Sequence, residues 1–187
     1  MKNIAVFVSR GGSNFQAIHH QIQSGNIPGK IVLVVSNDPN CGAITYAKEN
    51  KLSTLIINVI RYPEPENRDK ILFQALLKTK VDLICLAGYM KMLPKNIVTH
   101  FENQILNIHP ALLPDFGGKG FYGMKVHEVV IKAGVKQSGA TVHFADEEYD
   151  HGSIVAQRKV EVNQDDTPES LAKKVLKIEH QLYPQVV

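Results

Sequence analysis

The chain has 187 residues, of which 44% are hydrophobic and 21% charged, with 21 Lys and Arg against 18 Asp and Glu for a formal net charge of +3. Such a composition is typical of a folded globular protein and excludes intrinsic disorder. The apolar runs at 31–35 and 83–87 are far shorter than the ~20 residues that a membrane-spanning helix needs. We therefore expect a cytoplasmic protein with one domain over residues 1–187 and no membrane partner.

The distribution of charge and cysteine excludes further classes. Lys and Arg are scattered without a basic block, so we expect no nucleic-acid partner. Cys41 and Cys85 lie far apart in the sequence and form no CxxC pair. We therefore expect neither a disulfide framework nor a zinc knuckle.

Short β-branched runs alternate with helical patterns through the first two thirds of the chain. We expect strands at 4–8, 31–35, 53–57, 81–87 and 105–109, and helices at 15–23, 43–50, 68–78 and 94–101. Strands that are apolar on both faces and alternate with helices predict a parallel sheet covered on both sides.

The final third of the chain has a different pattern. Strands at 141–144 and 154–162 are separated by little more than an acidic turn, which predicts an antiparallel pair. Thr167 is expected to cap a helix that continues to about residue 183. The predicted fold class is α/β: a single doubly wound, mostly parallel sheet with helices on both faces and an antiparallel strand late in the chain. The glycine-rich segment 115–122 is the most loop-like part of the sequence and is expected to cover a site.

The first candidate site is the turn after the first strand, which contains Gly12, Ser13 and Asn14. Glycine lets backbone N–H groups approach an anion, and the start of the next helix adds favourable partial charge. The turn matches neither the G-x-G-x-x-G fingerprint nor the G-K-[ST] motif, so a single phosphate suits it better than a pyrophosphate. The alternative is a tight turn in which Asn14 only caps the helix.

The second candidate site is Asn107 and His109, at the carboxyl end of a buried strand. Alternation places both on one face of the strand, about 6–7 Å apart, and ligands of open α/β sheets bind at this edge. Pro110 ends the strand directly after them. The alternative is a structural histidine that donates to a loop carbonyl.

The third candidate is Asp150, the last carboxylate of the acidic turn. We expect the other carboxylates of the turn to be solvated and Asp150 to point inward. His109, His143, Asp150 and His151 would be an alternative set of metal ligands, but no metal-binding spacing supports it, and we expect no metal.

These segments together are similar to one known family. The matching text is IAVFVSRGGSNFQ at 4–16, LICLAGYMKML at 83–93, ILNIHPALLP at 105–114 and GATVHFADEEYDHGSIVAQ at 139–157. It resembles the phosphoribosylglycinamide formyltransferases, the folate-dependent enzymes of purine synthesis. The N-I-H-P-x-L-L-P motif is shared across the formyltransferase superfamily, whereas the G-S-N turn is the narrower signal.

The resemblance implies transfer of a formyl group from 10-formyltetrahydrofolate to the amine of 5-phosphoribosylglycinamide. Both are small molecules, and the family pattern leaves a monomer and a homodimer open. The amino-terminal half would be the phosphate side, and the carboxyl-terminal half the folate and catalytic side. The implied residues are Asn107, His109 and Asp150 for catalysis; Gly12, Ser13, Asn14 and Glu179 for the substrate phosphate; and Arg68, Met90, Lys91, Met92, Leu93 and Asn107 for the folate.

Two segments depart from the family pattern. The family's short Pro-Gly-Leu-His stretch is replaced by 115–122, and 58–67 aligns poorly, which weakens the assignment of Arg68. The alternatives are another 10-formyltetrahydrofolate-dependent formyltransferase or hydrolase, and a non-catalytic nucleotide-binding module. The tRNA formyltransferases and the hydrolases of the superfamily carry extra domains, and sugar formyltransferases lack the phosphate turn, so we expect the ribonucleotide as acceptor.

Overall fold

The computed structural model describes residues 1–187 and forms two compact units, Met1–Ile105 and Leu106–Val187. None of the helices combines the length and the hydropathy that a bilayer crossing requires. The expectation of one domain over the whole chain stays a prediction.

The first unit is built on four parallel strands, β1 (Lys2–Val8), β2 (Gly29–Ser36), β3 (Thr54–Ile56) and β4 (Leu83–Leu86), in the order β3-β2-β1-β4. Residues 4–8 of the central strand β1 are fully buried. A strand covered on both faces carries apolar side chains in both directions, which explains its unbroken apolar run.

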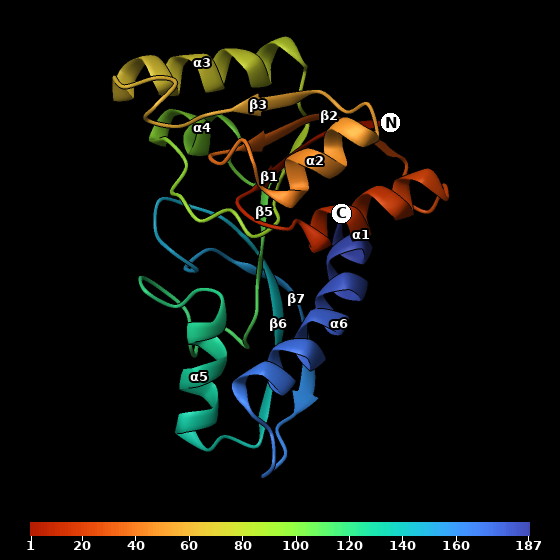
Figure 1. Ribbon diagram of the computed structural model, residues 1–187, viewed down its shortest axis with the longest axis vertical. Helices are drawn as coiled ribbons and strands as arrows, with labels where there is room; N and C mark the ends of the chain where they lie inside the picture. Colours follow the sequence, from red (N-terminus) through yellow and green to blue (C-terminus); the bar gives the residue numbers. More distant parts are fainter. The chain divides into compact units, whose positions relative to one another are not determined.

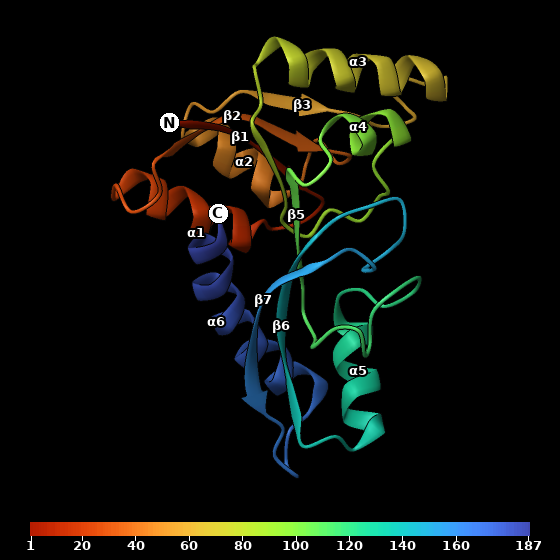
Figure 2. The same ribbon diagram turned by 180° about the vertical axis from the view of Figure 1, so that it is seen from behind.

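Four helices complete the first unit: α1 (Ser13–Gln23), α2 (Gly42–Glu49), α3 (Pro65–Lys78) and α4 (Lys95–His100). Helices α1 and α2 lie on one side of the strands and α3 on the other (Figures 1 and 2). Pro65 opens α3, where its missing N–H would have no helical partner anyway. The connections after β1, β2 and β4 leave the carboxyl ends of parallel strands, so they emerge at the same edge.

The second unit contains three antiparallel strands, β5 (Ile105–His109), β6 (Gln137–Phe144) and β7 (Ile154–Glu161), in that order. Its helices are α5 (Met124–Ala133) and α6 (Pro168–Val186). Helix α6 lies along β6 and β7 and also contacts α5 (Figure 1). The buried Tyr183 hydroxyl donates to the carbonyl of Leu106 at 2.8 Å, which joins α6 to β5.

The predicted α/β class, with parallel strands first and antiparallel strands late, is confirmed, as is each predicted helix and strand. One helix, α5, is not among the predicted elements. Its signal is Val126 and Val130, buried one helical turn apart, and Gly134 as a left-handed C-cap with φ 63°. Helix α6 also continues three residues beyond the predicted end at 183, through Pro184.

Thr167 caps α6 as predicted. Its Oγ1 accepts from the Ser170 N–H at 3.2 Å, and the Ser170 hydroxyl accepts from the Thr167 N–H at 3.0 Å. This reciprocal pair is a capping box, which satisfies two otherwise unpaired backbone donors.

Replacing Thr167 by alanine is expected to lower the free energy of unfolding by about 1 kcal/mol, because the cap acceptor is lost. Urea unfolding followed by circular dichroism measures the change. Thr167→Ser keeps the hydroxyl and is the matched control; an equal loss in both variants would contradict the capping role.

Candidate functional site

Two neighbouring strands of the second unit place three polar side chains together. Asn107 and His109 are two residues apart on β5 and therefore lie on the same face of the strand. The antiparallel register sets His143 of β6 directly opposite Asn107. His109 and His143 are buried, at 3% and 1% exposure. A register irregularity in the β6–β7 ladder falls between Val142 and His143. Such bulges redirect side chains next to active sites.

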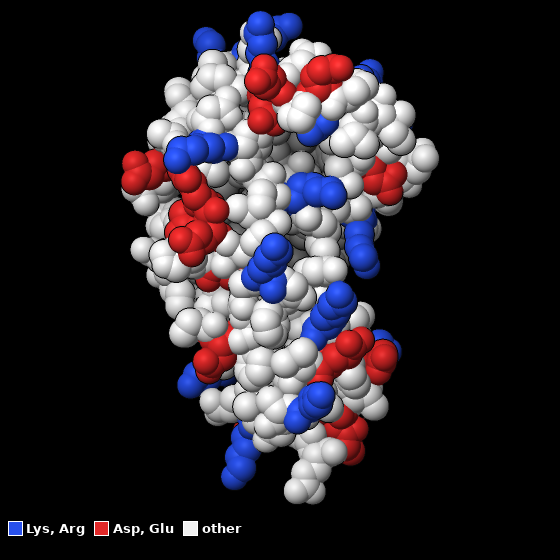
Figure 3. Space-filling model, turned by 90° about the vertical axis from the view of Figure 1, so that its left-hand side faces the viewer, with Lys and Arg blue, Asp and Glu red and all other residues white.

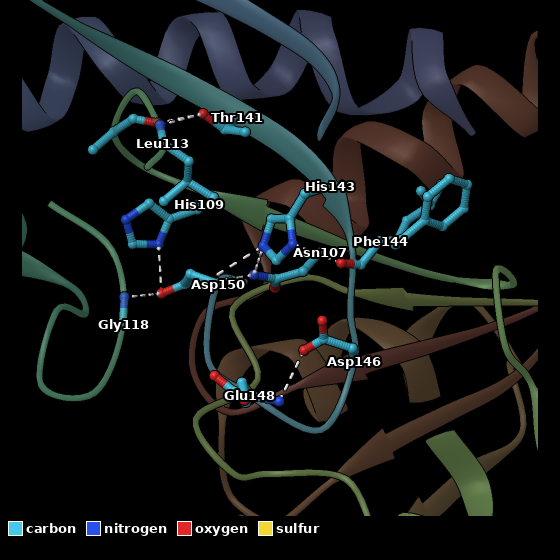
Figure 4. A network of polar contacts seen from close by, with 12 residues as sticks. Asn107, His109, Leu113, Gly118, Thr141, His143, Phe144, Asp146, Glu148 and Asp150 are labelled. Carbon is cyan, nitrogen blue, oxygen red and sulfur yellow. Dashed lines mark hydrogen bonds and ion pairs between the residues drawn. The ribbon is translucent and has the colours of Figure 1, made fainter. Parts of the chain in front are cut away.

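Asp150 comes from the turn between β6 and β7, and its side chain points toward β5 and β6 (Figure 4). Its backbone is left-handed, with φ 55°. Two residues later, a Cβ on Gly152 would lie 1.9 Å from the carbonyl oxygen of Phe144. Only glycine allows the chain to pass so close, so the return path that carries Asp150 inward depends on it.

The rest of the acidic turn faces solvent, as predicted. Asp146 accepts from the Glu148 N–H at 2.8 Å and pairs with the exposed His151 ring at 2.9 Å. Glu147 and Glu148 are exposed, whereas the Asp150 side chain is only 10% exposed. Asp150 is therefore the one carboxylate of this turn directed into the protein.

Polar atoms lie close to both oxygens of the Asp150 carboxylate (Figure 4). Oδ1 lies 3.3 Å from Asn107 Nδ2 and 3.5 Å from His143 Nε2. Oδ2 lies 3.4 Å from His109 Nδ1 and accepts from the Gly118 N–H at 3.0 Å. Asp150 thus lies within 3.4 Å of both Asn107 and His109, the residues predicted with it from the sequence as a catalytic trio.

These donors determine the protonation state of the carboxyl group. Burial by itself would raise the pKa of Asp150, but the hydrogen bond and charge of His109 and the hydrogen bond from the Gly118 N–H oppose it. Together they hold the pKa well below its usual range. Asp150 is therefore ionised throughout the physiological range.

The surrounding acceptors assign the ring protons of the two histidines. His143 Nδ1 lies 2.8 Å from the carbonyl oxygen of Phe144 and must donate to it, so Nε2 of the neutral ring accepts from Asn107 Nδ2 at 2.9 Å. His109 faces oxygen on both sides: Asp150 at Nδ1, and the carbonyl of Phe116 at Nε2, 2.9 Å away. Only the doubly protonated imidazole can donate to both.

His109 therefore also has the alternative role predicted for it, because it donates to a loop carbonyl as well as contacting Asp150.

Two other side chains hold the loop after β5 in place. Thr141 Oγ1 donates to Ala111 O at 2.6 Å and accepts from the Leu113 N–H at 3.0 Å, while Gln157 Nε2 donates to Leu113 O at 2.8 Å. The segment after β5 is thereby fixed to β6 and β7.

The predicted anion turn belongs to the first unit. Gly12 is left-handed, with φ 72°, and a Cβ there would lie 2.5 Å from Ala43 Cβ, so α1 and α2 meet only because this residue is glycine. Helix α1 begins at Ser13 without a side-chain cap. Gly12 occupies the N-cap position and Asn14 lies in the first turn, so Asn14 is not the N-cap, while the alternative of a tight turn without a ligand stays open. The first N–H groups of α1 have no such cap, as an anion site requires.

The predicted folate residues of the first unit lie in two segments. Met90 follows β4, and its N–H donates to the Ser9 hydroxyl at 2.9 Å, which joins this segment to the turn after β1. Arg68 Nη1 donates to the carbonyls of Tyr62 and Pro63 at 3.0 and 3.2 Å. Burial raises the pKa of Tyr89, next to Met90, to about 12, and the charge of Arg68 acts against that rise. Arg68 is thus near the segment that begins at Met90.

The remaining residues of that segment differ in exposure: Lys91 is exposed, Met92 is 39% exposed and Leu93 is buried. Asn107 belongs to the second unit, and so does Glu179, which is buried on α6. The roles of all these residues toward a folate or a phosphate stay predictions.

The alternative set of metal ligands has no geometric support. No group of three or more His, Cys, Asp or Glu side chains is arranged to hold a metal ion. His151, which that set requires, pairs with Asp146 instead.

The positioning groups around the trio are not among the residues predicted from the sequence. His143 was considered only as a metal ligand, although strand alternation from Thr141 and pairing with β5 would have placed it opposite Asn107. The contacts of the Gly118 N–H and the Phe116 carbonyl cannot be predicted from residue type, because every residue except proline carries both main-chain groups.

The whole chain matches known proteins. Residues 2–187 match the model of a family described as formyl transferase. The chain is 49% identical over its full length to the chloroplastic phosphoribosylglycinamide formyltransferase of Arabidopsis thaliana, spanning 64% of that protein. It is 34% identical to the phosphoribosylglycinamide formyltransferase of Bacillus subtilis, spanning 93% of it. The solved glycinamide ribonucleotide transformylase 1 of Geobacillus kaustophilus superimposes with a TM-score of 0.92 at 34% identity, covering all of this chain and 96% of that one.

Acid stability is expected to depend on Asp150. Because its pKa is lower in the folded state than the ordinary ~3.9 of the unfolded chain, ionised Asp150 stabilises the fold above that pH. This contribution is lost as the pH falls toward the folded-state value. Between pH 6 and pH 3, native protein should therefore lose more unfolding free energy in urea than Asp150→Asn does. Equal losses in the two proteins would contradict this account.

Proposed function

We propose, since this chain belongs to the formyl transferase family, that it transfers the formyl group of 10-formyltetrahydrofolate to the amine of 5-phosphoribosylglycinamide. The products are the N-formyl ribonucleotide and tetrahydrofolate, in purine synthesis. The observation that carries the proposal is the buried cluster of an amide, an imidazole and an ionised carboxylate on β5 and the turn before β7. Binding alone would not need this combination.

Formyl transfer begins when the substrate amine attacks the formyl carbon, which places negative charge on the formyl oxygen. His109 Nε2 and Asn107 Nδ2 are the donors for that oxygen. The formyl oxygen takes over the hydrogen bond that Nε2 makes to Phe116 O, and replaces the longer of the two Asn107 contacts, the one to Asp150. Removing one such donor typically costs about 2.7–4 kcal/mol of transition-state stabilisation.

Asp150 has two roles in this scheme. Its carboxylate pairs with His109 Nδ1 and so orients the ring, and it accepts the proton that leaves the attacking nitrogen, directly or through water. A carboxylate with so low a pKa is a weak base. It therefore acts after the new C–N bond has formed, when the nitrogen is cationic and strongly acidic. The bond from the formyl carbon to N10 of the folate then breaks, and N10 takes up the proton that Asp150 accepted from the attacking nitrogen, directly or through water.

Binding of the two substrates is assigned to the residues that the family resemblance implies. The phosphate is bound by Gly12, Ser13 and Asn14, with Glu179 on the ribonucleotide; the folate is bound along Met90, Lys91, Met92 and Leu93, with Arg68 toward its glutamate tail. The uncapped start of α1 supports the phosphate assignment. Basic and acidic side chains are interspersed on the face in Figure 3, as a small-molecule enzyme allows. We place the enzyme in the cytoplasm as a monomer or homodimer.

Purified protein should release the formyl group of 10-formyl-5,8-dideazafolate only when 5-phosphoribosylglycinamide is present, followed by absorbance. In Asp150→Asn, turnover should fall by about 10³-fold or more, because both the charge pair and the proton acceptor are lost. Affinity for the ribonucleotide should stay within about twofold, because its phosphate binds elsewhere. Release without the ribonucleotide would indicate a hydrolase, and no release would indicate another acceptor or a binding module.

Replacing Asn14 by alanine should raise the KM for the ribonucleotide at least about tenfold while the KM for the folate changes less than about twofold, because one substrate alone carries the phosphate. Steady-state kinetics with each substrate varied in turn measure the two constants. Asn26→Ala, in the exposed turn after α1, is the control. A larger effect on the KM for the folate than on the KM for the ribonucleotide would contradict the assignment of the phosphate to this turn.

A further inference from the structure

The loop after β5 contacts both charged members of the trio through its main chain. On one side of Gly117, the carbonyl of Phe116 accepts from His109 Nε2 at 2.9 Å. On the other side, the N–H of Gly118 donates to Asp150 Oδ2 at 3.0 Å. This segment lies in 115–122, where the chain departs from the family pattern.

Glycine at 117 is required for this close approach. A Cβ there would lie 2.3 Å from Leu113 Cδ2 and 3.2 Å from Asp150 Cβ. Leu113 has little freedom to retreat, because its side chain is buried and its backbone is bonded to Thr141 and Gln157. Any side chain at 117 would push the loop away from Asp150.

Gly118 presents its N–H from a left-handed backbone, with φ +93°. Of the two contacts on Asp150 Oδ2, the one from this N–H is shorter than the 3.4 Å to His109 Nδ1. The titratable groups that face Asp150 are His109 from β5 and His143 from β6. The peptide N–H does not titrate, so it remains a donor to the carboxylate at every pH.

We propose that Gly117 and Gly118 are positioning residues for Asp150: Gly117 lets the main chain lie against the carboxylate, and the Gly118 N–H holds Oδ2 in place beside His109. The consequence for turnover rests on the formyl transfer proposed above. The contact itself belongs to the free protein.

The test compares Gly118→Ala with Gly120→Ala. Both glycines have positive φ, +93° and +99°, and neither has an atom within 4 Å of an added Cβ, so the substitutions impose similar backbone strain. Only Gly118 donates to Asp150. The readout is the carboxyl carbon signal of protein labelled with [¹³C]aspartate, titrated without substrate, with the Asp150 signal assigned from its absence in Asp150→Asn.

We expect the Asp150 signal of the native protein and of Gly120→Ala to stay that of the ionised form over the whole folded pH range. Alanine keeps the N–H, but its Cβ is strained at φ +93°, and relief of that strain turns the N–H away from Oδ2. In Gly118→Ala the titration midpoint should therefore rise by about 1, seen as a signal that begins to shift toward the protonated form at the acid end of the folded range, because one hydrogen bond to the charged form is lost. The kcat of Gly118→Ala should fall by about ten- to hundredfold, as for loss of a hydrogen bond to a charged group. The kcat of Gly120→Ala should stay within about twofold of the native value.

Gly117→Ala is the second variant in case Gly118→Ala does not fold, and the same rise is expected. Two results would overturn the proposal. One is an Asp150 signal that changes equally in Gly118→Ala and Gly120→Ala, and the other is a signal that stays unchanged in both Gly117→Ala and Gly118→Ala. A midpoint that rises as expected in a protein without formyl transfer would support the positioning role and contradict the proposed function instead.

Discussion

The candidate site is organised by one constraint, the cost of burying a carboxylate. An isolated ionised carboxyl group is strongly destabilised away from water, and it persists only where charge and hydrogen bonds compensate. Asp150 is 10% exposed and remains ionised because the Asn107 amide, the His109 imidazole and the Gly118 N–H face it as donors. Two of these donors come from β5 and the third from the loop after β5, so a single charge ties the loop to the strand.

The antiparallel strands supply the accuracy that this arrangement needs. Pairing of β5 with β6 sets His143 opposite Asn107 and Thr141 opposite His109. His143 then orients the Asn107 amide, and Thr141 fixes the start of the loop. Positions on a hydrogen-bonded ladder are more precise than positions in a loop. The loop contributes only main-chain groups, and it is itself held by side chains from the strands.

The parts of the site that are predictable from sequence are those with a residue-type signature. Asn107 and His109 could be placed on one face because strand alternation has a period of two, and Asp150 stood out by its place directly before a strand. His143 required the strand pairing, which a single sequence does not reveal. The Gly118 N–H required three-dimensional proximity. Helix α5 was missed because its apolar face is short and follows the glycine-rich loop.

Gly152 has a consequence for how variants of this protein would be interpreted. No side chain fits at this position, because the backbone of Phe144 occupies the space. A substitution there would force the backbone at 152 away from Phe144, two residues after Asp150. It would abolish activity although residue 152 contacts no substrate. A mutational scan that scores activity alone would assign Gly152 to the catalytic machinery, although its contribution is entirely one of backbone geometry.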